Sequence, residues 1–186
     1  MANEYYSLTV AGLQRQLSIC PLNDKLSIAG FIMFSDVELT IACAEELLKK
    51  CPEADYIVTA ESKGIPLAYE MSRQSGIPYL LARKSVKLYM RAPIHETVKS
   101  ITTANEQTLY LDGQDAEKMK GKRVLIVDDV ISTGESLRTL EHLVNSAEGK
   151  IVGRATVLAE GDSADRDDII FLEKLPLFTS DGTPIE

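Results

Sequence analysis

The chain has 186 residues, 45% of them hydrophobic and 26% charged, which is enough apolar material to bury one sizeable core. Its formal net charge of −8 at pH 7 would repel the phosphates of a nucleic acid, so we expect no nucleic-acid partner. No stretch approaches the roughly 18 uninterrupted apolar residues that a membrane span needs, so we expect no membrane partner. The cysteines, Cys20, Cys43 and Cys51, lack metal-type spacing, so we expect free thiols in a cytoplasmic protein.

The N-terminal segment predicts a small cap followed by a helix. Residues 5–34 alternate short apolar and polar runs, a pattern that favours two or three short strands. The following helix is expected to begin at Ser35, because Glu38 stands three residues later and the two side chains can form a capping box. Apolar residues spaced by three and four predict the buried face of this helix: Val37, Ile41, Ala44 and Leu48.

Strand-like and helix-like segments alternate after residue 52. The expected strands are 56–60, 78–82, 123–129 and 151–159, with a weaker one at 108–111. The expected helices are 65–75 and 135–147. Apolar strands that do not alternate with polar residues, separated by single helices, indicate a parallel sheet covered on both faces. We therefore predict an α/β fold, a doubly wound and mainly parallel sheet, in a single domain over residues 1–186.

Two further regions are expected to lie around this sheet. Residues 85–107 lack sustained periodicity and are long for a loop inside a compact domain, which favours a flexible lid; a long β-ribbon is compatible with the same pattern. The ends of the chain, residues 1–34 and 160–186, are expected to form a cap or hood. The apolar run 175–178 would anchor the C-terminal part of that hood.

The sequence VLIVDDVISTGES, residues 124–136, carries the strongest chemical signal. Asp128 and Asp129 follow an apolar strand, and ligands of open α/β sheets bind beyond the carboxyl ends of the strands. A turn that opens a helix comes next, where free backbone N–H groups and hydroxyls favour a phosphate. The predicted phosphate contacts are Ser132, Thr133, Gly134, Glu135 and Ser136.

The two carboxylates cannot serve that phosphate, since like charges repel, so they need hydroxyl donors or a cation nearby. A ribose 5-phosphate supplies both a phosphate and two neighbouring hydroxyls. A Walker-type phosphate loop is excluded because Glu135, and not a lysine, follows Gly134. In a signalling receiver domain the turn would have no role. An acid pair that only caps the following helix remains the structural alternative.

With these features in place, residues 124–136 resemble the phosphoribosyl pyrophosphate (PRPP) signature of type I phosphoribosyltransferases. Three other segments are similar to the family in the same order. ESKG at 61–64 resembles its pyrophosphate loop, and ARKSVKL at 82–88 resembles the basic segment before its lid. FIMFSD at 31–36 resembles the segment that introduces the first helix of adenine phosphoribosyltransferases and helps to form the base pocket. The resemblance covers roughly residues 28–160.

This resemblance implies an enzyme that transfers the 5-phosphoribosyl group of PRPP to a purine base, giving a nucleoside monophosphate and pyrophosphate. The resemblance is closest to the adenine-type members of the family, so adenine is the first base that it implies. The alternatives are xanthine or another purine, or a PRPP-binding regulator without catalysis. The resemblance also implies a homodimer, and Mg²⁺ held through PRPP with no direct protein ligand.

The resemblance assigns roles to individual residues. Asp128 and Asp129 would be catalytic, holding the ribose hydroxyls. The implied pyrophosphate contacts are Ser62, Lys63, Gly64, Arg83, Lys84 and Lys87. Met33 and Phe34 would contact the base. Glu96 and Glu106, in the predicted lid, are candidates for proton transfer at the purine.

Overall fold

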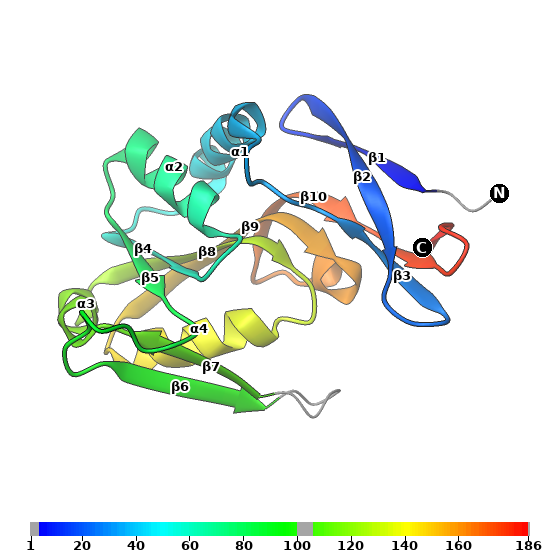
Figure 1. Cartoon of the computed structure of the whole chain (residues 1–186). Helices are drawn as coiled ribbons and strands as arrows, with labels where there is room; N and C mark the ends of the chain where they lie inside the picture. The colour runs from blue at the N-terminus through cyan, green and yellow to red at the C-terminus, as the bar shows by residue number, and fades with distance from the viewer. Residues whose placement is uncertain (1–3, 100–105, 186) are drawn as a thin grey trace.

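The computed structural model of the protein describes residues 4–99 and 106–185 (Figure 1). Its centre is a five-stranded sheet with the order β10-β9-β8-β4-β5, and every described pairing within it is parallel. The strands are β4 (Tyr56–Ala60), β5 (Tyr79–Ala82), β8 (Arg123–Ile131), β9 (Lys150–Glu160) and β10 (Ile170–Leu175). The predicted parallel α/β sheet is therefore confirmed.

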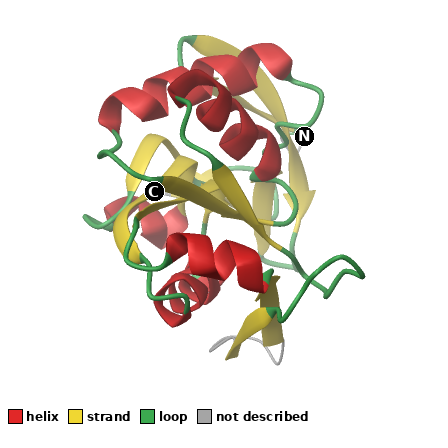
Figure 2. Cartoon of the chain, turned by 90° about the vertical axis from the view of Figure 1, so that its left-hand side faces the viewer, coloured by secondary structure: helices red, strands yellow, loops and turns green. Residues whose placement is uncertain are grey.

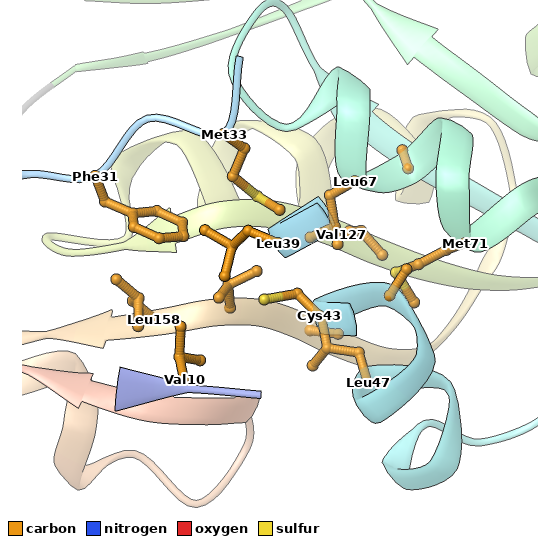
Figure 3. Packing of buried hydrophobic residues seen from close by; sticks show 14 of the residues in the cluster. Val10, Phe31, Met33, Leu39, Cys43, Leu47, Leu67, Met71, Val127 and Leu158 are labelled. Carbon is orange, nitrogen blue, oxygen red and sulfur yellow. The ribbon is translucent and has the colours of Figure 1, made fainter. Parts of the chain in front are cut away.

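Helices cover both faces of this sheet, as Figure 2 shows. They are α1 (Val37–Lys50) and α2 (Ile65–Ser75) on one face, and α3 (Gly113–Met119) and α4 (Glu135–Ser146) on the other. Alternate residues of β8 enter two separate apolar clusters, Leu125 and Val127 in one, Val124 and Ile126 in the other. Figure 3 shows Val127 among the side chains of α1 and α2. A strand buried on both faces needs the unbroken apolar run seen in the sequence.

The start and the buried face of α1 differ from the prediction. Asp36, and not Ser35, caps the helix, since its Oδ1 accepts a hydrogen bond from the N–H of Leu39 at 3.1 Å. Val37 is 68% exposed and Ile41 40% exposed, so the predicted stripe was wrong at both positions. The buried residues are Leu39, Thr40, Cys43, Ala44 and Leu47. Apolar side chains occur around most of this helix, so their spacing alone did not identify the face.

A second sheet forms a hood beside the central one, with the order β1-β2-β3-β11-β12. Its strands are β1 (Tyr5–Val10), β2 (Leu13–Pro21), β3 (Leu26–Gly30), β11 (Leu177–Thr179) and β12 (Pro184–Ile185). The prediction of two or three short N-terminal strands is confirmed, with β1, β2 and β3. Within the segment 160–186, β10 joins the central sheet, and only the part after Leu175 joins the hood. Leu175 and Phe178 are buried and anchor it.

The predicted lid region contains a two-stranded antiparallel ribbon of β6 (Ile94–Lys99) and β7 (Glu106–Leu111). The ribbon packs on α4 (Figure 1). Residues 100–105 of the predicted lid lie outside the described residues. The short helix α3 was not predicted; Asp112 caps it by accepting from the N–H of Gln114 at 2.9 Å.

The cysteines are free thiols, as expected. Burial raises the pKa of Cys43 to about 12, which keeps its thiol protonated and unreactive. Within the described ranges, no helix combines the length and the apolar character needed to cross a membrane.

Candidate active site

The acid pair lies where the strand order of the central sheet reverses, with β5 on one side of β4 and β8, β9 and β10 on the other. β8 pairs with β4 only as far as Ile126 opposite Val58, whereas its pairing with β9 continues to Ile131. The strand thus runs past its predicted end and contains Asp128 and Asp129. On the β4 side these two residues have no described backbone partner. Ligands of open α/β sheets bind at such a switch point.

The two carboxylates are short of positive charge. The side chain of Asp129 is only 3% exposed, and Nζ of Lys63 lies 3.3 Å from its Oδ2. No hydrogen-bond donor among the described residues reaches this oxygen, because the lysine contact is an ion pair without hydrogen-bond geometry. Burial, and then the charge of Asp129, raises the pKa of Asp128 well above its usual range. Hydroxyl donors or a cation would supply the missing hydrogen bonds or positive charge to both carboxylates.

The loop after β4 packs tightly against β8. Gly64 is buried, and a Cβ at this position would lie 2.4 Å from Oγ1 of Thr59 and 2.9 Å from Oδ1 of Asp128. The absence of a side chain therefore allows the loop to approach the acid pair. Pro66 then stands in the first turn of α2, a position that suits its fixed φ. The peptide bond between Glu61 and Ser62 is cis.

Glu61 connects this loop to the basic segment after β5. Its Oε2 accepts from the N–H of Lys84 at 3.1 Å and lies 3.3 Å from Nε of Arg83. The hydrogen bond from the Lys84 backbone, with the nearby cations, lowers the pKa of Glu61. The carboxylate is therefore ionised at neutral pH and holds two predicted pyrophosphate segments together.

A cavity of about 370 Å³ opens between these elements and the acid pair. It brings together several predicted site residues, namely Ser62, Lys63, Lys84, Asp128, Asp129 and Ser136. Its lining combines carboxylates with two lysines. A polar ligand with both hydroxyl and phosphate groups matches such a lining.

A second cavity of about 150 Å³ surrounds the turn before α4. It is lined by all five predicted phosphate contacts, Ser132, Thr133, Gly134, Glu135 and Ser136. Gly134 adopts φ +76°, a left-handed conformation that favours glycine. No side-chain cap hydrogen bond is formed at the start of this 12-residue helix, and the N-terminus of a helix is a place that suits an anion. Both cavities share Asp128, Val130 and Ser136, so they adjoin.

Five of the predicted PRPP and base contacts do not line either of these two cavities: Gly64, Arg83, Lys87, Met33 and Phe34. Arg83 pairs with Glu61, and Nζ of Lys87 donates to Oγ of Ser85 at 2.8 Å. Met33 is 1% exposed and points into the core beside Leu39 and Leu67 (Figure 3). Phe34 is 47% exposed. The predicted base contacts therefore do not face the acid pair through their side chains.

One residue of the site was missed. Gln107 of β7 lines both cavities and bonds to Ser136. Nothing in the local sequence EQTLYL singles it out, because its place depends on how the ribbon packs on α4.

The chain is similar to known proteins over most of its length. Residues 36–180 match the phosphoribosyl transferase domain family. A hypoxanthine/guanine phosphoribosyltransferase of Methanotorris igneus is 38% identical over 109 residues, which is 58% of this chain and 55% of that protein. One from Methanothermobacter thermautotrophicus is 32% identical over 134 residues, 72% of this chain and 66% of that protein. The chain thus spans between about half and two thirds of these relatives.

Solved structures resemble the fold. Adenine phosphoribosyltransferase of Leishmania tarentolae superposes with a TM-score of 0.67 at 20% identity, covering 92% of this chain and 83% of that one. The enzyme of Thermoanaerobacter pseudethanolicus gives a TM-score of 0.65 at 22% identity, covering 76% of this chain and 84% of that one. Identities this low support the architecture and leave the base open.

Proposed function

The chain belongs to the phosphoribosyl transferase domain family, and from this premise we propose that it is a purine phosphoribosyltransferase that uses PRPP. One observation carries the proposal. The acid pair and the phosphate turn line two adjoining cavities at the switch point of the sheet. A ribose 5-phosphate carries vicinal hydroxyls and a phosphate in one molecule, and so offers one group to the acid pair and the other to the turn.

In the proposed reaction, the C1–O bond of PRPP breaks, pyrophosphate leaves with the bonding electrons, a purine ring nitrogen forms the new bond to C1, and the N–H proton of that ring is released. Asp128 and Asp129 accept hydrogen bonds from the ribose hydroxyls, and negative charge on the pair favours the cationic sugar of the transition state. The turn at 132–136 holds the 5-phosphate. This fixes the sugar for in-line attack.

In the proposed reaction, Lys63 changes its partner from Asp129 to the pyrophosphate. In the free protein its ammonium pairs with Asp129, although its side chain is 51% exposed. When ribose hydroxyls replace it at Asp129, the lysine can turn toward the departing pyrophosphate. Lys84, on the same cavity, supplies a second positive charge. The protein thus exchanges an internal ion pair for contacts with the substrate.

The residues present fit a Mg²⁺ ion that arrives with PRPP. Oδ2 of Asp129 has no hydrogen-bond donor in the part of the chain described, and no group of three His, Cys, Asp or Glu there could hold a metal alone. Mg²⁺ commonly binds through one or two carboxylates, waters and substrate phosphates. Asp128 and Asp129 would hold it by way of the PRPP hydroxyls, and when bound it would neutralise part of the pyrophosphate charge.

For the base, we propose hypoxanthine or guanine ahead of adenine. The relatives above 30% identity carry the hypoxanthine/guanine name, whereas the adenine-type structures resemble the fold below 25% identity. A 6-oxopurine presents an acceptor at position 6 and a donor at N1, and adenine presents the reverse, so one site will discriminate strongly between them. Xanthine remains the further alternative.

We also propose a homodimer. Large apolar side chains are exposed on and beside α1 and α2: Phe34, Val37, Ile41 and Tyr69 are between 40% and 68% exposed. Val37, Ile41 and Tyr69 line one cavity, and an exposed apolar surface of this kind is typical of a subunit interface. α2 follows the pyrophosphate loop directly, so a partner there would lie near the site.

The deciding experiment supplies PRPP, Mg²⁺ and one of hypoxanthine, guanine, adenine or xanthine, and measures pyrophosphate release. We expect release with at least one base, first with a 6-oxopurine. Tight PRPP binding without turnover on any of the four bases would instead support the regulator. No binding of PRPP would refute the assignment of the ribose site.

A further inference from the structure

The side chain of Gln107 stands between the two cavities of the site. It lines the cavity around the phosphate turn and also the larger cavity beside the acid pair. It comes from β7, which reaches the site only because the ribbon packs on α4. A ribose 5-phosphate that occupies both cavities must pass beside this amide.

Gln107 is held there by the turn itself. Its Nε2 and its Oε1 each lie 3.1 Å from Oγ of Ser136, so the hydroxyl can donate to the amide oxygen or accept from the amide nitrogen. Ser136 is one of the proposed phosphate contacts. The ribbon and the phosphate turn are thus joined, in the free protein, through a group that the ligand also needs.

A bound phosphate changes this contact. A hydroxyl that donates to an ionised phosphate oxygen makes a stronger hydrogen bond than one that donates to a neutral amide. Ser136 would therefore turn its proton to the phosphate, and the amide nitrogen of Gln107 would be free to donate to the same oxygens. The oxygen of the amide carries no proton, so only one orientation of Gln107 is compatible with the ligand.

On this basis, and resting on the proposed function, we propose that Gln107 is a positioning residue that binds the 5-phosphate end of PRPP and couples its arrival to the ribbon β6–β7. The ribbon has a second side-chain contact with α4, in which Oγ of Ser146 donates to Glu96 at 2.5 Å. Ser146 lies at the other end of α4 from the turn and lines neither cavity among the described residues. Ser146→Ala is therefore a matched control that loosens the ribbon without touching the ligand.

The test is calorimetric titration of the full chain with ribose 5-phosphate, without base. Loss of one hydrogen bond in Gln107→Ala should weaken binding about fivefold, and the added negative charge in Gln107→Glu should weaken it by more than roughly tenfold. Ser146→Ala should bind as the wild type does. In hydrogen exchange, ribose 5-phosphate should protect the amides of β7 in the wild type and in Ser146→Ala, and not in Gln107→Ala.

Equal affinity of Gln107→Ala and the wild type would overturn the inference, and so would an equal loss in Ser146→Ala, which would mean that any loosening of the ribbon has the same effect. Both results leave the proposed function intact. A wild-type protein that does not bind ribose 5-phosphate at all would overturn the proposed function together with the inference. Thermal melting of each variant separates these outcomes from misfolding.

Discussion

The substitution Gly64→Ala tests the packing on which the whole site depends. The added Cβ would lie 2.4 Å from Oγ1 of Thr59 and 2.9 Å from Oδ1 of Asp128, where ordinary contact begins near 3.4 Å. The loop must therefore shift by about 1 Å, and inserting a group into packed structure costs typically about 1–3 kcal/mol. The backbone of Gly64, at φ −73°, suits alanine, so the steric cost is opposed only by about 0.4–1 kcal/mol of unfolded-state entropy.

We expect a net loss of about 1–2 kcal/mol in the free energy of unfolding, measured in urea. The KM for PRPP should rise, because the loop carries Lys63 away from the acid pair. Gly30→Ala is the matched control: its Cβ would meet only Ser18 O at 3.6 Å and Cys20 Sγ at 3.9 Å, both ordinary contacts. If Gly64→Ala keeps wild-type stability and PRPP use, the loop does not pack on β8 as described and the reasoning fails.

Other predictions address the acids and the interface. Asp129→Asn should lower PRPP turnover far more than Glu106→Gln in the pyrophosphate assay, and equal effects would mean that the ribose site is misplaced. Since the pKa of Asp128 is raised in the folded state, its protonated form stabilises the fold below the usual carboxyl range, and this contribution is lost as pH rises toward the raised pKa. Asp128→Asn should therefore gain stability over the wild type in urea unfolding as pH increases from 4 to 9, whereas a pH-independent difference would refute the raised pKa. Tyr69→Asp should lower the mass measured by light scattering to that of a monomer, and a mass equal to that of the wild type would place the interface elsewhere.

The sequence predicts the fold best where Gly and Pro mark the ends of elements. The strand 56–60 and the helix 65–75 agree with β4 and α2, because Pro52 precedes the first and Pro66 opens the second. The strand β10 was missed because it is an edge strand with mostly part-buried or exposed residues, so it lacks the fully buried apolar run of β8. The exposed Val37 and Ile41 show that spacing fails on a helix with apolar residues around most of its circumference.

In the candidate site too, local sequence predicts the residues of a motif and does not predict residues that only tertiary packing brings there. Asp128 and Ser136 belong to one motif, so local sequence is enough to predict that they lie together, and they line one cavity. Gln107 was not, because only the packing of a distant ribbon brings it to the turn. Met33 was assigned from a resemblance, and its side chain points into the core instead.

The ion pairs among the proposed pyrophosphate contacts affect which anions the protein can bind. Lys63 already faces Asp129, and Glu61 already occupies the Arg83 side chain and the Lys84 backbone. A singly charged anion such as chloride would have to displace a carboxylate of equal charge and would gain little by doing so. Only a ligand with several negative charges, or one that brings its own cation for Asp129, has a net advantage. The free protein thus carries internal competitors that reject the abundant small anions of its surroundings.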